Sequence, residues 1–170
     1  AGVTSCAMKT LKVEGKTIIT NEGLGDERAI ISRCFSVAGA VQCGFCIPGF
    51  VSRTSALLDK NPNPTRDEIR KQLGVHLCRC TGYVKILDAI ELAAKVRRGE
   101  CPLPEPLVSD GKNGAVGRRL PRYLGESYAL GDQPYVEDMS APGMLDGALR
   151  LSDHPRAIQC AVSLTRLLCQ

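Results

Sequence analysis

The sequence predicts a mainly α-helical fold built around four helices. Between residues 27 and 98, apolar residues recur at spacings of three and four, as in helices that bury one face. A capping-box pattern also opens a short helix in the middle of this region. Asparagine, proline and glycine separate the helical segments, and these residues favour turns. We therefore expect residues 26–98 to form one four-helix unit.

The first elements each have a local signal. Residues 16–20 read Lys-Thr-Ile-Ile-Thr between glycine-containing turns, so we expect a strand followed by a loop. The first helix is expected over residues 27–41, where the apolar residues form one stripe. The second is expected to begin at Pro48, which the first helical position tolerates, and to end near Lys60 before Asn-Pro-Asn-Pro.

The third and fourth helices are bounded by capping signals. Thr65 and Glu68 fit a capping box, in which both side chains satisfy free amides at the start of a short helix that ends at Leu73. The fourth helix is expected over residues 83–98, with cations in its last turn and Gly99 as its stop.

The composition changes after the fourth helix. Residues 101–106 are rich in proline, and residues 109–119 are rich in glycine and polar side chains. These features predict a linker or an arm that lies on a neighbouring domain. Turn residues return between residues 132 and 157, and apolar residues alternate at 148–151, so we expect short strands there.

Composition argues against several classes of protein. Hydrophobic residues make up 44% of the chain and charged residues 24%, which is ordinary globular usage. The net charge of +4 is spread out, and its basic spots lack interleaved aromatic residues, so we expect no nucleic-acid binding. The sequence contains no run of about 18 apolar residues, so no membrane-spanning helix is predicted. The chain begins with alanine rather than methionine, so we expect an upstream segment, and we place the protein provisionally in the cytoplasm.

Nine cysteines are many for a chain of this length. Their odd number and uneven spacing are unlike a small secreted disulfide scaffold, so metal ligation is the better interpretation. Cys43 and Cys46 lie between the first two expected helices, and Cys78 and Cys80 lie between the last two. Helices that fold as two antiparallel pairs would bring these junctions together. The four thiolates therefore predict a metal centre.

Four thiolates suit either a [2Fe-2S] cluster or a structural zinc ion, and their spacing alone leaves both open. Three features favour iron. The Cys-x-Cys half is unusual beside common zinc spacings, Gly44 and Gly82 allow close backbone approach, and amides at helix starts can donate to sulfur. The alternative without a metal is that these cysteines are small buried hydrophobes.

The remaining candidate ligands are weaker. Cys34 falls on the apolar stripe of the first helix and is expected in the core. Cys101, Cys160 and Cys169 show no pairing pattern. We expect His76 to be a polar loop residue near the metal rather than a fifth ligand or a proton relay.

Two motifs carry a resemblance to a known family. Residues 42–50 read Gln-Cys-Gly-Phe-Cys-Ile-Pro-Gly-Phe, and residues 77–83 read Leu-Cys-Arg-Cys-Thr-Gly-Tyr, with Pro-Thr at 64–65 and Glu-Ile at 68–69 between them. In these motifs the chain resembles the molybdenum hydroxylases, which include xanthine dehydrogenases and aldehyde oxidoreductases. The resemblance implies that residues 26–98 are the second iron-sulfur domain of such an enzyme, close to its molybdopterin cofactor.

The same resemblance implies roles for single residues. Gln42 and Cys80 would lie against the pterin, where electrons enter the domain. Val-His at 75–76 departs from the Gly-Asn that the family usually has there, which would change the hydrogen bonds of the loop. The cluster ligands would be Cys43, Cys46, Cys78 and Cys80.

The resemblance also assigns the other segments. Residues 1–25 would be the end of a β-grasp, plant-type ferredoxin domain, with Cys6 as the last ligand of a second [2Fe-2S] cluster that only the full-length protein holds. Residues 99–131 would be an extended linker, and residues 132–170 the truncated start of the molybdenum-binding α/β domain, including its first strands. Residues 158–170 do not match the family, as expected of a truncated or frame-shifted reading frame.

The implied function is electron relay within a larger oxidoreductase. Molybdopterin in the full-length protein would take electrons from the substrate, and this domain would pass them singly toward a flavin subunit or a separate carrier. Its partner would be the molybdopterin-binding domain of the same enzyme, and a homodimer is compatible with the family. We expect no catalytic acid or base here, so the fragment alone should be inactive. The rival functions are a zinc-stapled helical interaction module without redox activity and a free-standing ferredoxin-like carrier.

Overall fold

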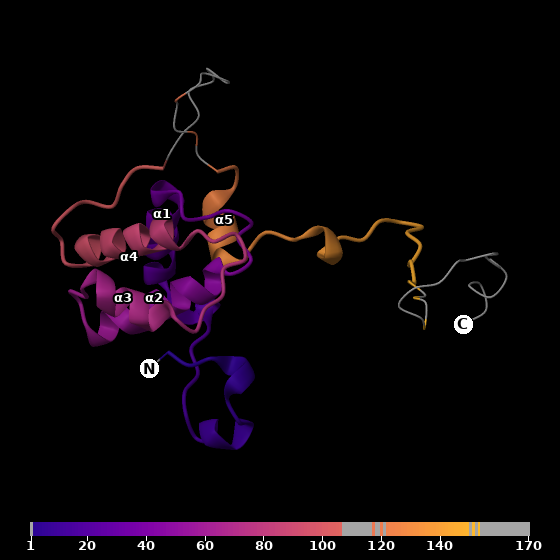
Figure 1. Ribbon diagram of the computed structural model, residues 1–170, viewed down its shortest axis with the longest axis horizontal. Coiled ribbons are helices and arrows are strands. Elements are labelled where there is room, and N and C mark those ends of the chain that lie inside the picture. Colours follow the sequence, from indigo (N-terminus) through magenta and orange to yellow (C-terminus); the bar gives the residue numbers. More distant parts are fainter. Residues whose placement is uncertain are drawn as a thin grey trace. The chain divides into compact units, whose positions relative to one another are not determined.

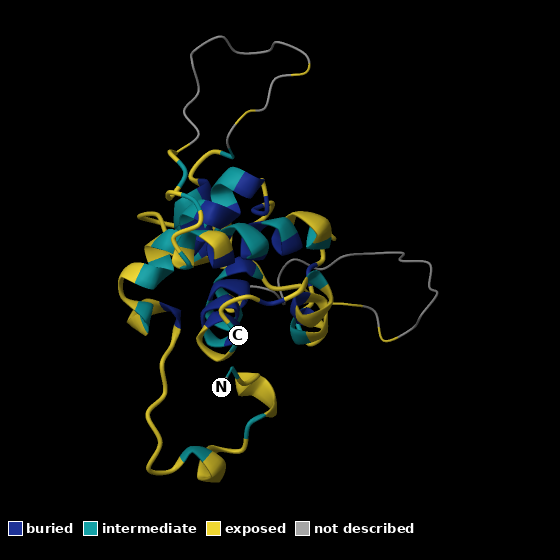
Figure 2. Ribbon diagram, turned by 90° about the vertical axis from the view of Figure 1, so that its left-hand side faces the viewer, coloured by how far each residue is buried: buried dark blue, intermediate teal, exposed yellow. Residues whose placement is uncertain are grey.

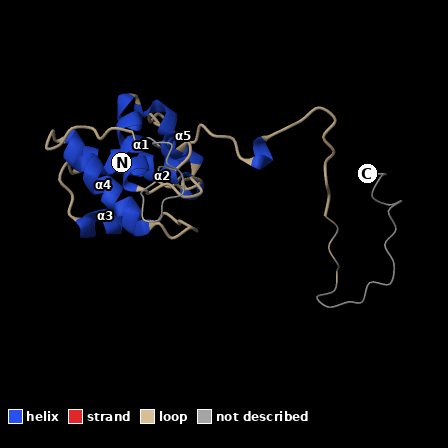
Figure 3. Ribbon diagram, turned by 90° about the horizontal axis from the view of Figure 1, so that it is seen from above, coloured by secondary structure: helices blue, strands red, loops and turns tan. Residues whose placement is uncertain are grey.

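The computed structural model describes residues 2–106, 117, 120, 122–149, 151 and 153. The chain divides into two compact units, residues 1–134 and residues 135–170, and each is described by itself. The first unit is helical, as the ribbon views show (Figure 1, Figure 3). The predicted mainly helical fold is therefore confirmed.

Four helices form the core of the first unit, in the predicted order. α1 packs against both α2 and α4, and α3 contacts the same two helices. The four helices therefore form a closed ring of contacts, α1 with α2, α2 with α3, α3 with α4 and α4 with α1. The bounds are Asp26–Ala38 for α1, Ile47–Lys60 for α2, Arg66–Leu73 for α3 and Tyr83–Arg97 for α4.

The helix ends follow the local sequence. α1 stops at Gly39, whose φ of 72° is left-handed and favours glycine. α3 starts with the predicted capping box: the backbone N–H of Thr65 donates to the Glu68 carboxylate at 2.7 Å, and the Glu68 N–H donates to the Thr65 hydroxyl at 3.3 Å. These bonds satisfy amides that a helix start leaves without intrahelical partners.

The core lies between these helices. Buried residues line the inner faces of the ribbons in Figure 2. Cys34 is fully buried among them, as predicted from its place on the apolar stripe. Burying one large apolar side chain contributes about 1.5–3 kcal/mol, so this cluster holds the helices together. Its largest fully buried apolar side chains are Phe35, Phe50, Ile31, Ile47, Leu58, Ile69, Ile86 and Ile90.

A fifth helix, α5, spans Gly125–Leu130 and was not predicted. It lies within the segment expected to be a linker and packs against α1 and α2. Ala129 on this helix is fully buried. α5 is therefore part of the helical core of the first unit.

The strand predicted at residues 16–20 is wrong: these residues have no regular secondary structure. They lie between the 3-10 helices Thr10–Val13 (η2) and Asn21–Leu24 (η3), after a first one at Ser5–Ala7 (η1). Ile18 and Ile19 are each 64% exposed. A strand needs a paired neighbour for its backbone groups, and none of the described residues forms a strand.

The strands predicted between residues 132 and 157 are likewise not observed where the structure describes the chain. The second unit contains one 3-10 helix, η4, at Val136–Asp138 among its described residues. The remaining described positions up to 149 are turns or irregular backbone. An alternation over only four residues was too short to specify a strand without a partner strand. Residues 154–170 lie outside the described residues.

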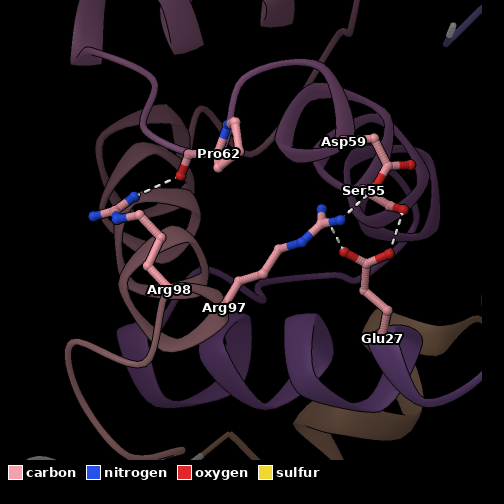
Figure 4. Close-up of polar contacts among 6 residues, drawn as sticks. All are labelled: Glu27, Ser55, Asp59, Pro62, Arg97 and Arg98. Carbon is pink, nitrogen blue, oxygen red and sulfur yellow. Dashed lines mark hydrogen bonds and ion pairs between the residues drawn. The ribbon is translucent and has the colours of Figure 1, made fainter.

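Polar contacts join three helices at one end of the bundle (Figure 4). Nη1 of Arg97 on α4 lies 2.9 Å from the Glu27 carboxylate on α1, and the same guanidinium pairs with Asp59 on α2. The Ser55 hydroxyl donates to Glu27 at 2.7 Å. Asp59 and Arg97 are near the C-terminal ends of α2 and α4. The cysteine loops precede the N-terminal ends of the same two helices.

Candidate metal centre

The first cysteine loop, residues 42–46, connects α1 to α2. The carbonyl of Gly44 accepts the N–H of Ile47 at 3.0 Å, and Cys46 is the residue immediately before α2. Gly44 has a φ of 91°, and a Cβ added there would lie 2.8 Å from the Cβ of Tyr128. Both the backbone conformation and the close approach of Tyr128 therefore require glycine between the two cysteines.

The second cysteine loop, residues 77–82, leads into α4. The N–H of Thr81 donates to the Cys78 carbonyl at 3.1 Å and closes a tight turn around Cys80. Thr81 has a φ of 57°, a left-handed conformation that costs about 1–2 kcal/mol for a residue with a Cβ. Such strain is typical of functional loops that their surroundings hold in place.

Tyr83, the first residue of α4, organises the backbone of this loop. Its hydroxyl accepts the N–H of Cys78 at 2.7 Å and donates to the carbonyl of His76 at 3.1 Å. Its ring meets the Phe50 ring edge-on, with centroids 6.5 Å apart. Sequence reasoning included Tyr83 in a motif but gave it no role, because a hydroxyl that bonds to the backbone leaves no signal in residue spacing.

His76 lies beside the site as a packed side chain. Its ring centroid is 5.1 Å from that of Phe50, and burial, with a smaller contribution from Arg53, lowers the pKa of His76. The neutral ring that burial favours is consistent with packing on Phe50. Its predicted place near the metal remains a prediction.

The two cysteine loops meet at their thiols and at Gln42. Burial raises the pKa of Cys46 to about 12, helped by a hydrogen bond with the Cys78 thiol. The pKa of Cys80 is lowered, chiefly because the backbone N–H of Cys43 donates to its thiol. The Gln42 amide oxygen lies 3.4 Å from where a Cβ on Gly82 would be.

The thiols of the two loops are thus neighbours: Cys46 is paired with Cys78 and Cys43 with Cys80, and Cys46 also interacts with Cys43. Each pair takes one thiol from each loop. Within the described residues, no three or more Cys, His, Asp or Glu side chains gather in an arrangement that would hold one metal ion. A [2Fe-2S] centre takes two thiolates on each iron, so four thiols from two neighbouring loops could supply its ligands.

The pairs differ in their exposure to solvent. Cys78 is buried, Cys46 and Cys80 are partly exposed, and Cys43 is exposed. Gln42 is exposed beside Cys43. The Cys43 and Cys80 side of the centre therefore faces outward, whereas the Cys46 and Cys78 side faces the core.

The other cysteines lie elsewhere. Cys6 is exposed on η1, and no contact joins it to the two loops among those described. Burial raises the pKa of Cys34 to about 12, with a smaller contribution from the charge of Cys101. Cys160 and Cys169 lie outside the described residues.

Comparison with known proteins identifies the helical domain. The family model of the [2Fe-2S] binding domain matches residues 20–91. The small FeS subunit of nicotinate dehydrogenase from Eubacterium barkeri is 46% identical over 95 residues, which are 55% of this chain and 60% of that protein. The aldehyde oxidoreductase of Megalodesulfovibrio gigas is 34% identical over 158 residues, which are 88% of this chain and 17% of that protein.

A solved structure agrees with the sequence comparisons. The aldehyde oxidoreductase from Desulfovibrio gigas matches with a TM-score of 0.69 and 34% identity, over 80% of this chain and 16% of that one. This chain spans 60% or less of the length of these relatives.

The helical fold and the family match identify the class of this domain as [2Fe-2S] binding. Residues 20–91 match the model of the [2Fe-2S] binding domain, and the chain is similar in sequence to aldehyde oxidoreductases and xanthine dehydrogenases. The resemblance inferred from the two motifs is therefore confirmed. The described part of the chain has no helix of sufficient length and apolar character to cross a membrane.

Proposed function

We propose that this domain binds one [2Fe-2S] cluster and relays electrons within an oxidoreductase of the xanthine dehydrogenase or aldehyde oxidoreductase type. The ligands would be Cys43, Cys46, Cys78 and Cys80. The supporting observation is the meeting of the two loops, which places one thiol of each loop beside a thiol of the other. When bound, the cluster would accept and donate one electron at a time.

The surroundings of the thiols set the conditions for ligation. Cys46 holds its proton in the metal-free chain because burial raises its pKa to about 12. Thiolates rather than thiols bind iron, so ligation would release this proton and depend on pH. The pKa of Cys80 is instead lowered, because the backbone N–H of Cys43 donates a hydrogen bond to its thiol. Cys80 is therefore easier to deprotonate than Cys46.

The outward side of the centre is the proposed entry point for electrons. Gln42 and Cys80 lie there, and we assign them to contact with the molybdopterin cofactor of the full-length protein. Two large apolar side chains beside the ligands are exposed, Phe45 by 80% and Leu77 by 73%. Exposed apolar side chains next to a site favour coverage by a partner surface. The partner would be the molybdopterin-binding domain of the same enzyme.

The flanking segments are assigned by extension of the same proposal. Residues 1–25 would end a ferredoxin-like domain, with Cys6 as a ligand of a second [2Fe-2S] cluster in the full-length protein. Residues 132–170 would begin the molybdenum-binding α/β domain. The alignment with the M. gigas enzyme extends well beyond residues 20–91, which supports both assignments. Dimerisation, a flavin subunit or carrier as acceptor, and a cytoplasmic location remain predictions.

A serine scan of the cysteines tests the ligand set. Each of the four ligands is replaced in turn in the full chain, and iron and acid-labile sulfide are measured after anaerobic purification. The four variants should lose most of their iron and sulfide, since serine is a poor substitute for a thiolate. Cys101→Ser is the matched control and should retain wild-type content. A Cys78→Ser chain with full iron and sulfide would contradict the proposed ligand set.

A further inference from the structure

Residues 122–132, which include α5, are fixed onto the helical core by polar contacts. The carbonyl of Leu130, at the end of α5, accepts hydrogen bonds from Asn21 at 2.7 Å and from Arg28 at 2.8 Å. A helix end leaves its last carbonyls without intrahelical partners, so these bonds hold the end of α5 in place. Arg28 also pairs with Asp132 just beyond the helix. The segment therefore has a defined position on the domain.

Packing fixes the same segment at its middle. Arg33 on α1 pairs with Glu126 on α5, with 2.6 Å between Nε and Oε1. A Cβ added to Gly125 would lie 2.9 Å from the Ser36 hydroxyl oxygen, so α5 approaches α1 closely at this point. Ala129 is fully buried.

The start of the segment contacts the first cysteine loop. Nε of Arg122 donates to the backbone carbonyl of Gln42 at 2.6 Å. The Arg122 guanidinium carbon lies 4.1 Å from the centroid of the Tyr128 ring, a cation–π distance. The Tyr128 side chain fills the space beside Gly44, where a Cβ would be only 2.8 Å away. Two stacked side chains thus contact the loop backbone on both sides of Cys43.

We propose that Arg122 and Tyr128 are positioning residues for Cys43. They hold Gln42 and Gly44, and thereby keep the Cys43 thiol beside Cys80. This inference rests on the ligand set proposed above. It assigns a role to a segment outside the matched residues 20–91. The iron-sulfur unit therefore extends to residue 132.

The physical reason is preorganisation. A loop whose backbone is held before ligation does not lose that conformational freedom when the metal binds. A charge-assisted bond from a guanidinium to a carbonyl is also stronger than one between neutral groups. Loss of either contact should free the loop, so the outward thiolate pair would release its iron faster. We expect about a tenfold change, which corresponds to about 1.4 kcal/mol.

Hydrogen exchange and iron release in the full chain test the proposal. The test variants are Arg122→Gln and Tyr128→Ala. Tyr128→Phe, which keeps the aromatic ring, is the comparison for Tyr128→Ala. The amides of residues 40–47 should exchange about tenfold faster in the first two variants, and iron should pass to the chelator bathophenanthroline about tenfold faster. Tyr128→Phe should exchange and release iron more slowly than Tyr128→Ala, because it keeps the ring that stacks on Arg122. Wild-type exchange and release in Arg122→Gln would overturn the proposal.

The controls separate positioning from general loss of stability. Arg98→Gln removes bonds to Glu100 and Pro62, a contact remote from the loop, and should leave exchange at 40–47 unchanged. If Tyr128→Ala does not fold, Arg122→Gln decides, because Arg122 is only partly buried and its replacement keeps a polar side chain of similar length. If the wild-type chain holds no iron, the ligand set fails, but exchange of residues 40–47 in the same variants still tests the positioning role.

Discussion

The hydroxyl of Tyr83 accepts the backbone N–H of Cys78 at 2.7 Å and so ties a proposed ligand to the first turn of α4. The same hydroxyl donates to the carbonyl of His76 at 3.1 Å. One side-chain oxygen therefore satisfies two backbone groups of the second cysteine loop. A cluster ligand whose backbone is held in this way has few alternative positions.

Tyr83→Phe should destabilise the chain by about 1–3 kcal/mol, since each of two hydrogen bonds contributes about 0.5–1.5 kcal/mol. The ring remains against Phe50, so packing is preserved. Urea unfolding followed by circular dichroism measures the free energy of unfolding. Tyr123→Phe is the control, because Tyr123 is 79% exposed. Equal stability of the Tyr83→Phe and Tyr123→Phe chains would refute the role of the hydroxyl.

Gly44→Ala should reduce both stability and iron content. The new Cβ would adopt an unfavourable φ and would also collide with Tyr128. Gly15→Ala is the matched control, because Gly15 has a φ of 70° but nothing within 4 Å of the added Cβ. The control should cost about 1–2 kcal/mol from backbone strain alone. The same urea titration should show a larger cost for Gly44→Ala.

The double variant Gly44→Ala, Tyr128→Ala isolates the collision. Removing the Tyr128 ring should restore part of the stability lost in Gly44→Ala, since the two side chains occupy the same space. If the double variant loses as much stability as Gly44→Ala and Tyr128→Ala lose together, Tyr128 does not constrain Gly44.

Arg79→Glu should lower the reduction midpoint of the cluster. A cation beside the cluster stabilises the more negative reduced state, and its reversal removes that effect. A unit charge about 10 Å away contributes about 0.4 kcal/mol in water, so the shift should be on the order of tens of millivolts. Lys85 is a weaker candidate for this effect, because its ammonium lies 3.7 Å from the Asp88 carboxylate.

A redox titration measures this shift, and Lys60→Glu is the matched control. Lys60 is the last residue of α2, whereas Cys46 immediately precedes that helix. The helix separates them by about 20 Å, roughly two Debye lengths in physiological salt. The control should therefore change the midpoint little. An unchanged or raised midpoint in Arg79→Glu would contradict the expected electrostatic effect.

Glu68 should make stability depend on pH in the acid range. Hydrogen bonds from the backbone N–H and the hydroxyl of Thr65 lower the pKa of Glu68 in the folded chain. The folded state then binds fewer protons than the unfolded state, so this contribution is present above the ordinary glutamate pKa of about 4.3 and is lost as the pH falls through the lowered value. Glu68→Gln should weaken the dependence, as urea titrations from pH 6 to 3 would show.

Asp67→Asn is the control for this pH dependence. It removes a carboxylate from the same first turn of α3 but leaves the capping box intact. If both variants have the same pH profile, charge near the helix start, rather than the cap, would account for the effect.

The sequence predicted the four core helices because each has a long apolar stripe or a recognisable cap. α5 was missed because six residues span less than two turns, too few to establish a period, although Gly131 after Leu130 is a typical helix stop. Its buried position depends on contacts with α1 and α2, which are distant in sequence. The strand at residues 16–20 was wrongly predicted because β-branched composition alone does not supply a pairing partner.

At the candidate site, the spacing of the cysteines identified the two loops, and the structure brings them together. Spacing did not reveal which thiols are neighbours, since that depends on how α2 and α4 pack. The contacts of Tyr83, Arg122 and Tyr128 were also beyond sequence reasoning. Two of these side chains bond to backbone groups, and Tyr128 lies against a glycine, so residue spacing in a motif does not reveal these contacts.

Metal analysis of the wild-type chain tests the central claim most directly. The chain is purified without oxygen, and iron, acid-labile sulfide and zinc are measured together with an electron paramagnetic resonance spectrum after dithionite reduction. We predict two irons and two sulfides per chain and a rhombic signal in the reduced state, as expected of one [2Fe-2S] cluster. One zinc ion in a colourless chain without sulfide would contradict the electron-transfer function and would instead establish a structural metal site.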